Sequence, residues 1–309
     1  MTEAGHQIDV SSDCGSTNQV VYCEMINLER DRDRRDHMEA ELDRAGVQAH
    51  FFPGFDYQVD DKEEMYRQCL PEGPWGVFHL QNMACTISHA RALERFLKTD
   101  ADLCLILEDD VLIAPDLGQW ILDMSWWPKD AGIVKIERWP GARTRVLMDA
   151  PVAHHRGRKV ARMLSRHVGS AGYFITRPAA KSVLEDRPFD ISIDNLLFNA
   201  NASRVARKLE IYQVTPALVT QGNEPPDSAA RGGTRLRPKG WPLLRQKIKR
   251  AYYEAAYPLT TIAKYLTGRA TLENVPYSAH TALSNTGHEV AMTKTKNTPE
   301  GDARHGRID

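Results

Sequence analysis

Along the first two thirds of the chain, apolar segments of strand length alternate with segments whose apolar residues have helical spacing. The pattern predicts strands at 20–28, 103–107, 132–136, 173–176 and 209–214, and 103–107 is an unbroken apolar run. Apolar residues spaced by three and four positions predict helices over 38–45, 83–98, 117–124, 178–184 and 194–198. Strands that are followed by helices in this way are typical of an α/β fold.

The apolar run at 103–107 is the most informative because it ends in three consecutive carboxylates, Glu108, Asp109 and Asp110. Ligands in open α/β sheets collect at the carboxyl ends of strands, where these acids are expected. Adjacent acids repel one another, so the cluster favours a divalent cation, and oxygen ligands suit Mg²⁺ or Mn²⁺. The alternative is that the acids cap the next turn or helix.

A charged loop, 29–36, follows the first predicted strand and contains Arg30, Arg34 and Arg35. Guanidinium groups bind phosphate oxygens in pairs, so a loop of this kind suits a diphosphate or a nucleotide. The alternative is a solvated helix start whose opposite charges pair at a spacing of three or four residues.

Two stretches lack a clear period. The pattern predicts a long loop with one helical turn over 57–82, and a basic flexible loop over 138–166 that either admits an anionic acceptor or is plain surface. Glu137 ends the strand before the second loop. The chemistry of Ser88 and His89 is unremarkable by sequence alone, because adjacent helix residues point in different directions.

Composition narrows the class of protein. The chain has 309 residues, 42% of them apolar, which is enough for one large core, and its net charge is −1. Five cysteines, two of them inside strand-like runs, favour reduced thiols in a cytosolic protein. We expect neither a signal peptide nor a membrane-spanning helix, and no nucleic-acid partner.

The predicted organisation is a disordered N-terminus over 1–18, a catalytic domain over 19–222, a basic helical appendage over 223–279 and a disordered tail over 280–309. Between Arg231 and Arg269 the lysines and arginines greatly outnumber the single acid, Glu254, and apolar residues keep a helical spacing. Such a segment suits docking on an anionic membrane surface. The alternative is a helix packed on the catalytic domain.

Several segments in a fixed order carry a family resemblance. They are Ile26-Asn27-Leu28 with Arg30, Arg34 and Arg35; Phe51-Phe52-Pro53-Gly54; Ala84-Cys85 with Ser88-His89; Leu107-Glu108-Asp109-Asp110; Gly172-Tyr173; Asp194 before Leu197-Phe198; and Pro216-Ala217-Leu218-Val219-Thr220-Gln221. Together they resemble family 25 glycosyltransferases of the lipooligosaccharide-biosynthesis type. The resemblance covers about 20–221.

The resemblance implies a GT-A-like fold, a Rossmann-type mixed sheet flanked by helices. It also implies a nucleotide-sugar donor, with UDP-hexose favoured, and Mn²⁺ or Mg²⁺ held by Asp110 with Asp109 and Glu108. The donor-binding residues that it implies are Asn27, Leu28, Arg30, Arg34, Arg35, Gly54, His89, Glu108, Asp109 and Gly172.

The resemblance further implies inverting transfer, in which one carboxylate takes the proton of the acceptor hydroxyl as general base. Asp194 is the first candidate, with Asp190 and Glu137 in reserve. The family often has proline before its late aspartate, whereas this chain has Ser192, so both Asp190 and Asp194 stay under consideration.

The predicted function is therefore transfer of a sugar to a cell-surface glycan or a lipid-linked glycan, by a cytoplasmic enzyme that is peripheral on the inner membrane face. Two other functions use the same features. A metal-dependent phosphohydrolase or nucleotidyltransferase would use the same acids, and a non-catalytic membrane-associated binding protein would use the fold and the basic segment.

Overall fold

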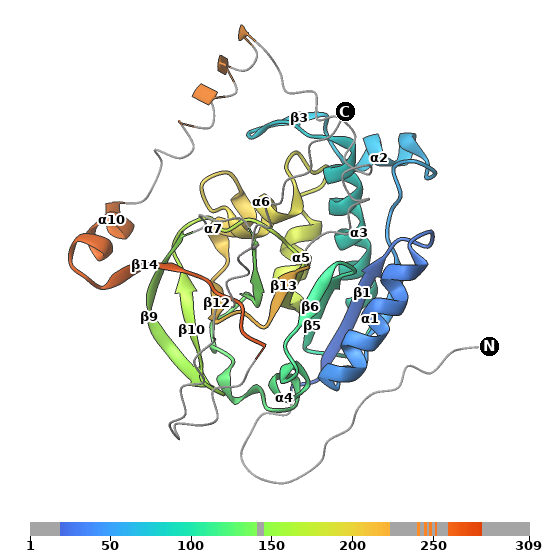
Figure 1. The fold of residues 1–309 in the computed structure, drawn as a ribbon. Helices are drawn as coiled ribbons and strands as arrows, with labels where there is room; N and C mark the ends of the chain where they lie inside the picture. Colours follow the sequence, from blue (N-terminus) through green and yellow to red (C-terminus); the bar gives the residue numbers. More distant parts are fainter. Residues whose placement is uncertain are drawn as a thin grey trace, which may run out of the picture.

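The computed structural model describes residues 19–140, 145–222 and 259–279, and positions 240–241, 244–245, 247–248 and 251. Its centre is a mixed sheet of nine strands in the order β14-β9-β10-β12-β7-β11-β5-β1-β2 (Figure 1). The strands are β1 (Val21–Asn27), β2 (His50–Pro53), β5 (Leu103–Glu108), β7 (Ile133–Lys135), β9 (Arg145–His155), β10 (Arg158–Met163), β11 (Gly172–Thr176), β12 (Ile211–Thr215) and β14 (Ala270–Asn274).

Two smaller sheets accompany the large one. β6 (Val111–Ile113), β13 (Val219–Gln221) and β8 (Glu137–Arg138) form a three-stranded sheet that begins directly after the acid cluster. β3 (Glu72–Gly73) and β4 (Gly76–Val77) form a hairpin. The helices are α1 (Arg32–Ala45), α2 (Lys62–Gln68), α3 (Leu80–Phe96), α4 (Leu117–Leu122), α5 (Arg177–Leu184), α6 (Ile193–Phe198), α7 (Arg204–Lys208) and α10 (Leu259–Leu266), with a short 3-10 helix, η1, at Met124–Trp126.

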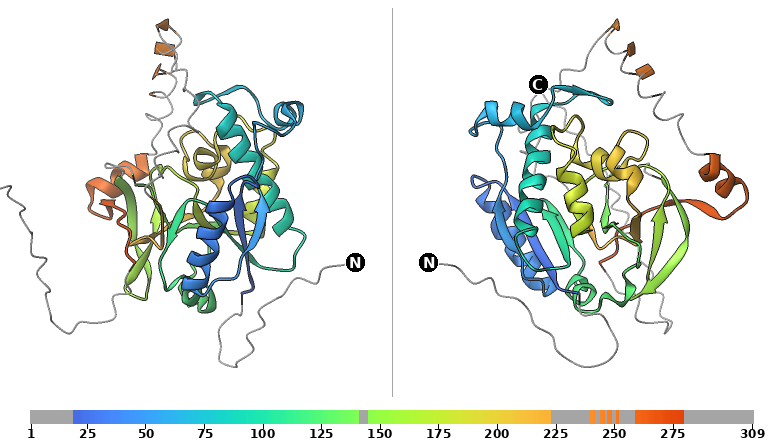
Figure 2. Two further views of the ribbon diagram at one scale, coloured as in Figure 1. Left: turned by 45° about the vertical axis from the view of Figure 1, so that its right-hand side comes forward. Right: turned by 180° about the vertical axis from the view of Figure 1, so that it is seen from behind.

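Helices cover both faces of the large sheet, and each face has its own apolar core. α3, α5 and α6 pack on one face, where Ile87, Leu93 and Val183 belong to one cluster. α1 and α4 pack on the other face, where Met38 and Trp120 belong to a second cluster (Figure 2). The structure thus has the predicted fold class, a large mixed α/β sheet flanked by helices.

Parallel pairing places the carboxyl ends of the first two predicted strands, β1 and β5, next to each other. β1 pairs in parallel with both β2 and β5, so their carboxyl ends lie together. β11 runs antiparallel to β5, and its first residue, Gly172, pairs with Leu107. Gly46 ends α1 in the left-handed conformation, with φ of 65°, as expected of a glycine helix stop.

The prediction of a flexible basic loop over 138–166 was wrong, because most of this stretch is the hairpin of β9 and β10. Val146, Met148 and Val160 are buried in the core, and one charged residue next to each of them is exposed or half-buried. Arg156 and Gly157 form the turn, with φ of 47° and 70°. Two positive φ angles fit a two-residue hairpin turn, but Arg-Gly is a weaker turn signal than Asn-Gly or Asp-Gly.

The end of the predicted appendage belongs to the main fold. β14 pairs with β9 at the sheet edge, and Lys264 of α10 forms an ion pair with Asp149 of β9. Most of 223–258 lies outside the described residues, as do the ends at 1–18 and 280–309, for which we predicted disorder. Within the described residues, no helix is both long enough and apolar enough to cross a membrane.

Candidate active site

The three acids lie where the central strand β5 ends. β5 lies between β1 and β11 and is buried from Leu103 to Leu107. Glu108 is the last strand residue, and Asp109 and Asp110 form the turn to β6. Hydrogen bonds of Glu108 and Asp109 go to side chains of β1, α1, α3 and β11's approach loop rather than to the start of a following helix.

Asp109 ties two other elements to the acid cluster. Its Oδ2 accepts a hydrogen bond from Nδ2 of Asn27 at 2.8 Å, and its Oδ1 accepts one from Nη1 of Arg34 at 2.8 Å. Asn27 ends β1 and Arg34 lies in the first turn of α1. Both carboxylate oxygens of Asp109 are therefore engaged by protein, and the residue holds the first strand and helix against the site.

Asp110 differs from Asp109 in that one of its oxygens has no partner among the residues that the structure describes. Oδ1 is buried and makes no hydrogen bond, while the backbone carbonyl accepts one from the amide of Gly222 at 2.8 Å. Burial, followed by the charges of Glu108 and Asp109, raises the pKa of Asp110 to about 8. A buried carboxylate oxygen without a partner is costly, so this position suits a bound cation.

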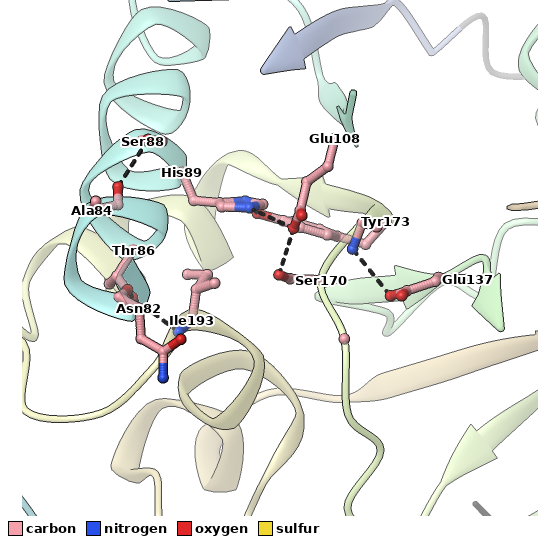
Figure 3. A network of polar contacts seen from close by, with 12 residues as sticks. Asn82, Ala84, Thr86, Ser88, His89, Glu108, Glu137, Ser170, Tyr173 and Ile193 are labelled. Carbon is pink, nitrogen blue, oxygen red and sulfur yellow. Dashed lines mark hydrogen bonds and ion pairs between the residues drawn. The ribbon is translucent and has the colours of Figure 1, made fainter. Parts of the chain in front are cut away.

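Glu108 is held by a network of side chains on α3 and β11 (Figure 3). Its Oε1 lies 2.7 Å from Oγ of Ser170 and 3.1 Å from Nε2 of His89, whose Nδ1 lies 2.9 Å from the hydroxyl of Tyr173. Burial acts to raise the pKa of Glu108, but His89 and Ser170 outweigh it and lower the pKa. Neighbouring carboxylates thus have pKa values moved in opposite directions.

Cys85 lies one turn before His89 on α3, and its Sγ, a His89 ring nitrogen and a Glu108 oxygen are all within 4.8 Å of one another. This trio is a poor metal site in the observed state. Burial, then the charge of Glu108, raises the pKa of Cys85 well above its ordinary value, so the thiol keeps its proton, and both nitrogens of His89 are already engaged.

A buried ion pair fixes the loop that carries Ser170. Nζ of Lys135 lies 3.1 Å from Oε2 of Glu137, and both side chains are fully buried. Nζ also donates to the carbonyls of Val168 and Gly169, and Oε2 of Glu137 accepts the amide of Ala171 at 3.0 Å. Burial raises the pKa of Glu137 to about 7. The geometry makes Glu137 a support for the loop, with no exposed surface toward an acceptor.

Gly169 provides a test of this loop. Its φ is 86°, and a Cβ here would lie 2.3 Å from Oε1 of Glu137. We expect Gly169→Ala to lower the free energy of unfolding by about 1–3 kcal/mol, because alanine is strained at positive φ and displaces a buried carboxylate. Gly46→Ala is the matched control, since Gly46 has φ of 65° but nothing within 4 Å of the added methyl group.

Chemical denaturation of both variants measures the difference. Gly46→Ala pays only for backbone strain, so Gly169→Ala should be clearly the less stable of the two. Equal losses of stability would show that the contact with Glu137 is relaxed at no cost, and that the loop is not held in the way described.

Asp194 lies close enough to the acid cluster that its charge, like those of Glu108 and Asp110, helps to raise the pKa of Cys85. It is in the first turn of α6, half-buried, and its Oδ1 accepts hydrogen bonds from Oγ of Ser192 and from Nδ2 of Asn195. The amide of Ile193 donates to Oγ1 of Thr86, which anchors this turn to α3. The pKa of Lys135 is lowered by burial, and Glu137 and then Asp194 act against this effect.

Asp190 occupies a different environment. A Cβ on Gly73 would lie 1.9 Å from the carbonyl oxygen of Asp190, so its backbone packs directly on the β3–β4 hairpin. Asp190 and Asp194 therefore lie in one segment but have different neighbours. The structure links Asp194 to the charged groups of the site and Asp190 to the hairpin.

The three arginines predicted for the first loop pair with three different acids. Only Arg34 reaches the acid cluster, through Asp109. Arg30 pairs with Asp56 at 2.5 Å and Gln58 at 2.8 Å, and Arg35 lies on the outer surface of α1, where it pairs with Glu39. The helix-start alternative thus describes Arg35 well, while Arg34 serves the site through a carboxylate.

The motif glycines allow close packing. A Cβ on Gly54 would lie 3.2 Å from Ile26, 3.3 Å from Leu28 and 3.3 Å from Oγ of Ser88, and a Cβ on Gly172 would lie 3.1 Å from Val219. Oγ of Ser88 also accepts the amide of Phe55 at 2.7 Å. These contacts bind the end of β2 to β1 and α3, and set the start of β11 beside β13.

Three residues of the site were not identified from the sequence: Ser170, Tyr173 and Lys135. A lysine within the apolar run 132–136 was a usable signal, because a buried cation requires a nearby partner. Tyr173 belongs to a motif of the family resemblance, but no role was predicted for it, and Ser170 carried no signal, since only folding brings the two residues to His89 and Glu108.

Comparisons with known proteins identify the family of the chain. The model of glycosyltransferase family 25 (LPS biosynthesis protein) matches residues 22–197, more than half of the chain. The chain belongs to glycosyltransferase family 25. The matched region contains the acid cluster, α3 and the first turn of α6.

Individual relatives are also named for glycosyltransferase activity or lipooligosaccharide biosynthesis. The chain is 29% identical over 210 residues to the lacto-N-neotetraose biosynthesis glycosyltransferase LgtE of Neisseria gonorrhoeae, with 64% of this chain and 72% of the relative covered. It is 25% identical over 211 residues to the lipooligosaccharide biosynthesis protein lic2B of Haemophilus influenzae, with 64% and 74% covered. The protein is thus a glycosyltransferase of a lipopolysaccharide-biosynthesis family.

Solved structures resemble it only distantly. A glycosyltransferase involved in the glycosylation of the major capsid of PBCV-1 has a TM-score of 0.34 and 10% identity, with 75% of this chain and 98% of that chain covered.

Proposed function

We propose that this family 25 protein transfers a sugar, with inversion, from a nucleotide-sugar donor to a hydroxyl of a cell-surface glycan. UDP-hexose is the favoured donor. The observation that carries the proposal is the buried, unpaired Oδ1 of Asp110 beside Glu108 at the carboxyl end of β5. The names of the relatives, which include lipooligosaccharide biosynthesis, favour a lipid-linked glycan as acceptor.

The residues present fit a divalent cation. Asp110 supplies a buried oxygen without a partner, and Glu108 supplies a carboxylate that is 21% exposed and held by His89 and Ser170. Carboxylate oxygens suit Mn²⁺ or Mg²⁺. Asp109 positions Asn27 and Arg34 rather than binding the cation, because both of its oxygens already accept hydrogen bonds from them. A bound cation would stabilise the charge that develops on the leaving diphosphate.

Asp194 is the proposed general base. Ser192 and Asn195 donate to its Oδ1, which holds the carboxylate in one orientation and leaves Oδ2 to accept a proton. The acceptor hydroxyl attacks the anomeric carbon from the face opposite the diphosphate, its proton passes to Asp194, and the bond to the diphosphate oxygen breaks. His89 and Ser170 keep Glu108 ionised and oriented throughout.

The test is a screen of the purified full chain against a panel of nucleotide sugars with Mn²⁺, in which nucleoside diphosphate release is followed with and without glycan acceptors. We expect release from one donor, stimulated by an acceptor and lost with a chelator. Release of inorganic phosphate or pyrophosphate, independent of any glycan, would instead show a phosphohydrolase or nucleotidyltransferase.

We also propose that the protein works at the cytoplasmic face of a membrane and binds anionic lipid through 231–269. Among the described positions of this segment, Trp241, Leu244 and Ile248 are exposed apolar side chains, and Arg245 and Lys247 lie between them in sequence. Each basic residue near an anionic leaflet contributes about 1 kcal/mol.

Flotation with vesicles measures this binding. We expect recovery with anionic vesicles at low salt, a loss of recovery at high salt because exposed charges are screened, and no recovery with neutral vesicles. Removal of the segment after Gly222 also removes β14, so Leu244→Glu with Ile248→Glu is the better variant. Equal recovery of this variant and the unaltered chain would contradict the proposal.

A further inference from the structure

A cavity lies at the β9–β14 edge of the large sheet, and neither the catalytic proposal nor the family motifs use it. It has a volume of about 490 Å³, within the range of small-ligand sites. Aromatic side chains of Trp75 and Tyr265, two arginines and two asparagines are among its lining residues. It is formed by the edge strands β9 and β14, the loop after β10, the C-terminal end of α6 and the β3–β4 hairpin.

The charged side chains that line the cavity are basic. Arg145 and Arg166 contribute guanidinium groups, and none of the described lining residues is acidic. The guanidinium of Arg166 lies over the ring of Trp75, with 5.3 Å between its central carbon and the ring centroid. Guanidinium groups bind carboxylates and phosphates through paired hydrogen bonds, and a flat aromatic face packs against apolar faces of a ligand.

The walls are fixed in place. Trp75 lies in the turn of the hairpin whose Gly73 packs on the backbone of Asp190. Asn199 is 1% exposed, donates through Nδ2 to Oδ1 of Asn195 at 2.9 Å, and accepts the amide of Asn201 at 3.2 Å. A cavity with preset walls binds without a large ordering cost.

Two short links join the walls of the cavity to the proposed catalytic groups. Arg166 and Ser170 belong to one loop and are four residues apart, so their Cα atoms are separated by at most about 14 Å. Ser170 contacts Glu108. On the other wall, Asn199 bonds to Asn195, and Asn195 bonds to Asp194 at 3.2 Å. A short glycan held in the cavity can therefore present a neighbouring hydroxyl to the reaction site.

We propose that this cavity is an acceptor subsite that binds an anionic sugar, one that carries a phosphate or a carboxylate. The proposal rests on the proposed glycosyltransferase function and specifies the chemical class of its acceptor. Trp75 and Tyr265 pack on the sugar, and Arg145 and Arg166 bind its negative group. Selectivity for acidic over neutral acceptor glycans follows from this arrangement.

The test is binding of glucose, glucose 6-phosphate and glucuronic acid to the full chain, measured by ligand-observed NMR in the presence of UDP and Mn²⁺ to occupy the donor site. We expect both anionic sugars to bind about tenfold more tightly than glucose, the usual effect of a charge-assisted hydrogen bond. The phosphate and carboxylate arms show which anionic group is preferred.

Variants separate the two features of the cavity. Arg166→Gln should remove most of the preference for anionic sugars, and Trp75→Ala should weaken binding of all three sugars, glucose included. Arg67→Gln, on the exposed surface of α2, is the matched control and should change nothing. UDP binding with Mn²⁺ should be the same in all three variants.

Three results would overturn the subsite: equal affinity for glucose and the anionic sugars, equal weakening by Arg67→Gln and Arg166→Gln, or displacement of both anionic sugars by inorganic phosphate alone at similar concentrations. Failure of the catalytic proposal gives a different result, because UDP then does not bind with Mn²⁺ in the unaltered chain, whatever the sugars do.

Discussion

Asp110→Asn is expected to abolish Mn²⁺-dependent binding of the nucleotide sugar and to lower turnover at least about 100-fold, because it removes the carboxylate that fits the cation best. Calorimetric titration of UDP with and without Mn²⁺ measures the first effect, and diphosphate release measures the second. The physical basis is the buried Oδ1 that no protein group satisfies. Unchanged Mn²⁺-dependent affinity would rule out Asp110 as a ligand.

Asp110→Asn should lose activity but gain stability in the absence of metal. The pKa of Asp110 is raised to about 8, so between its ordinary value and pH 8 the folded state holds a proton that the unfolded state has lost. Stability therefore falls as pH rises through this window, and asparagine, which does not titrate, removes the loss. Without metal, Asp110→Asn should have a higher Tm than the unaltered chain at pH 8.

Asp109→Asn is the neighbouring comparison. It removes the negative charge that pairs with Arg34 at 2.8 Å and keeps Asp110 and Glu108. We expect a lower Tm, because a partly buried guanidinium loses its partner, and a smaller loss of Mn²⁺ affinity than in Asp110→Asn. The reverse order of the two metal affinities would mean that Asp109, rather than Asp110, faces the cation.

Asp194→Asn is expected to lower turnover by a factor of about 10² to 10⁴ with nearly unchanged donor affinity, the usual loss when a positioned proton acceptor is removed. Asparagine keeps the size of the side chain but cannot take the proton. Its effect on stability should be small, about 0.3–1 kcal/mol, because Asp194 lies in the first turn of a helix, where a negative charge is favoured.

Asp190→Asn is the matched control, four residues away in the same segment. Its backbone packs on the hairpin, whereas Asp194 is the acid linked to Lys135 and Cys85. Single-turnover measurements of both variants with saturating donor compare the chemical step directly. A larger loss in Asp190→Asn, or full turnover in both, would remove Asp194 as the base.

The sheet edge shows how far periodicity can mislead. β9 and β10 contain three arginines, a lysine and two histidines among their apolar residues, and we interpreted this high charge as a loop. A strand with one solvated face tolerates that composition, because only every second residue needs to be apolar. β14 was missed for a related reason: it is five residues long, and its pairing partner, β9, is more than a hundred residues away in sequence.

What the sequence by itself determined is the set of local features: the buried strand that ends in Glu108, Asp109 and Asp110, the helix that carries His89, and the late Asp194. These features depend on residue type and spacing over a few positions, so they are legible without the fold. The order of the motifs also predicted the family.

Tertiary structure alone decided how the charges are divided. It pairs Asp109 with Asn27 and Arg34, leaves an oxygen of Asp110 without a partner, and buries Glu137 against Lys135. Burial and the direction of each side chain set these differences, because desolvation and hydrogen bonding depend on groups that lie far apart in sequence. Three adjacent acids of similar intrinsic chemistry therefore receive different roles from their surroundings.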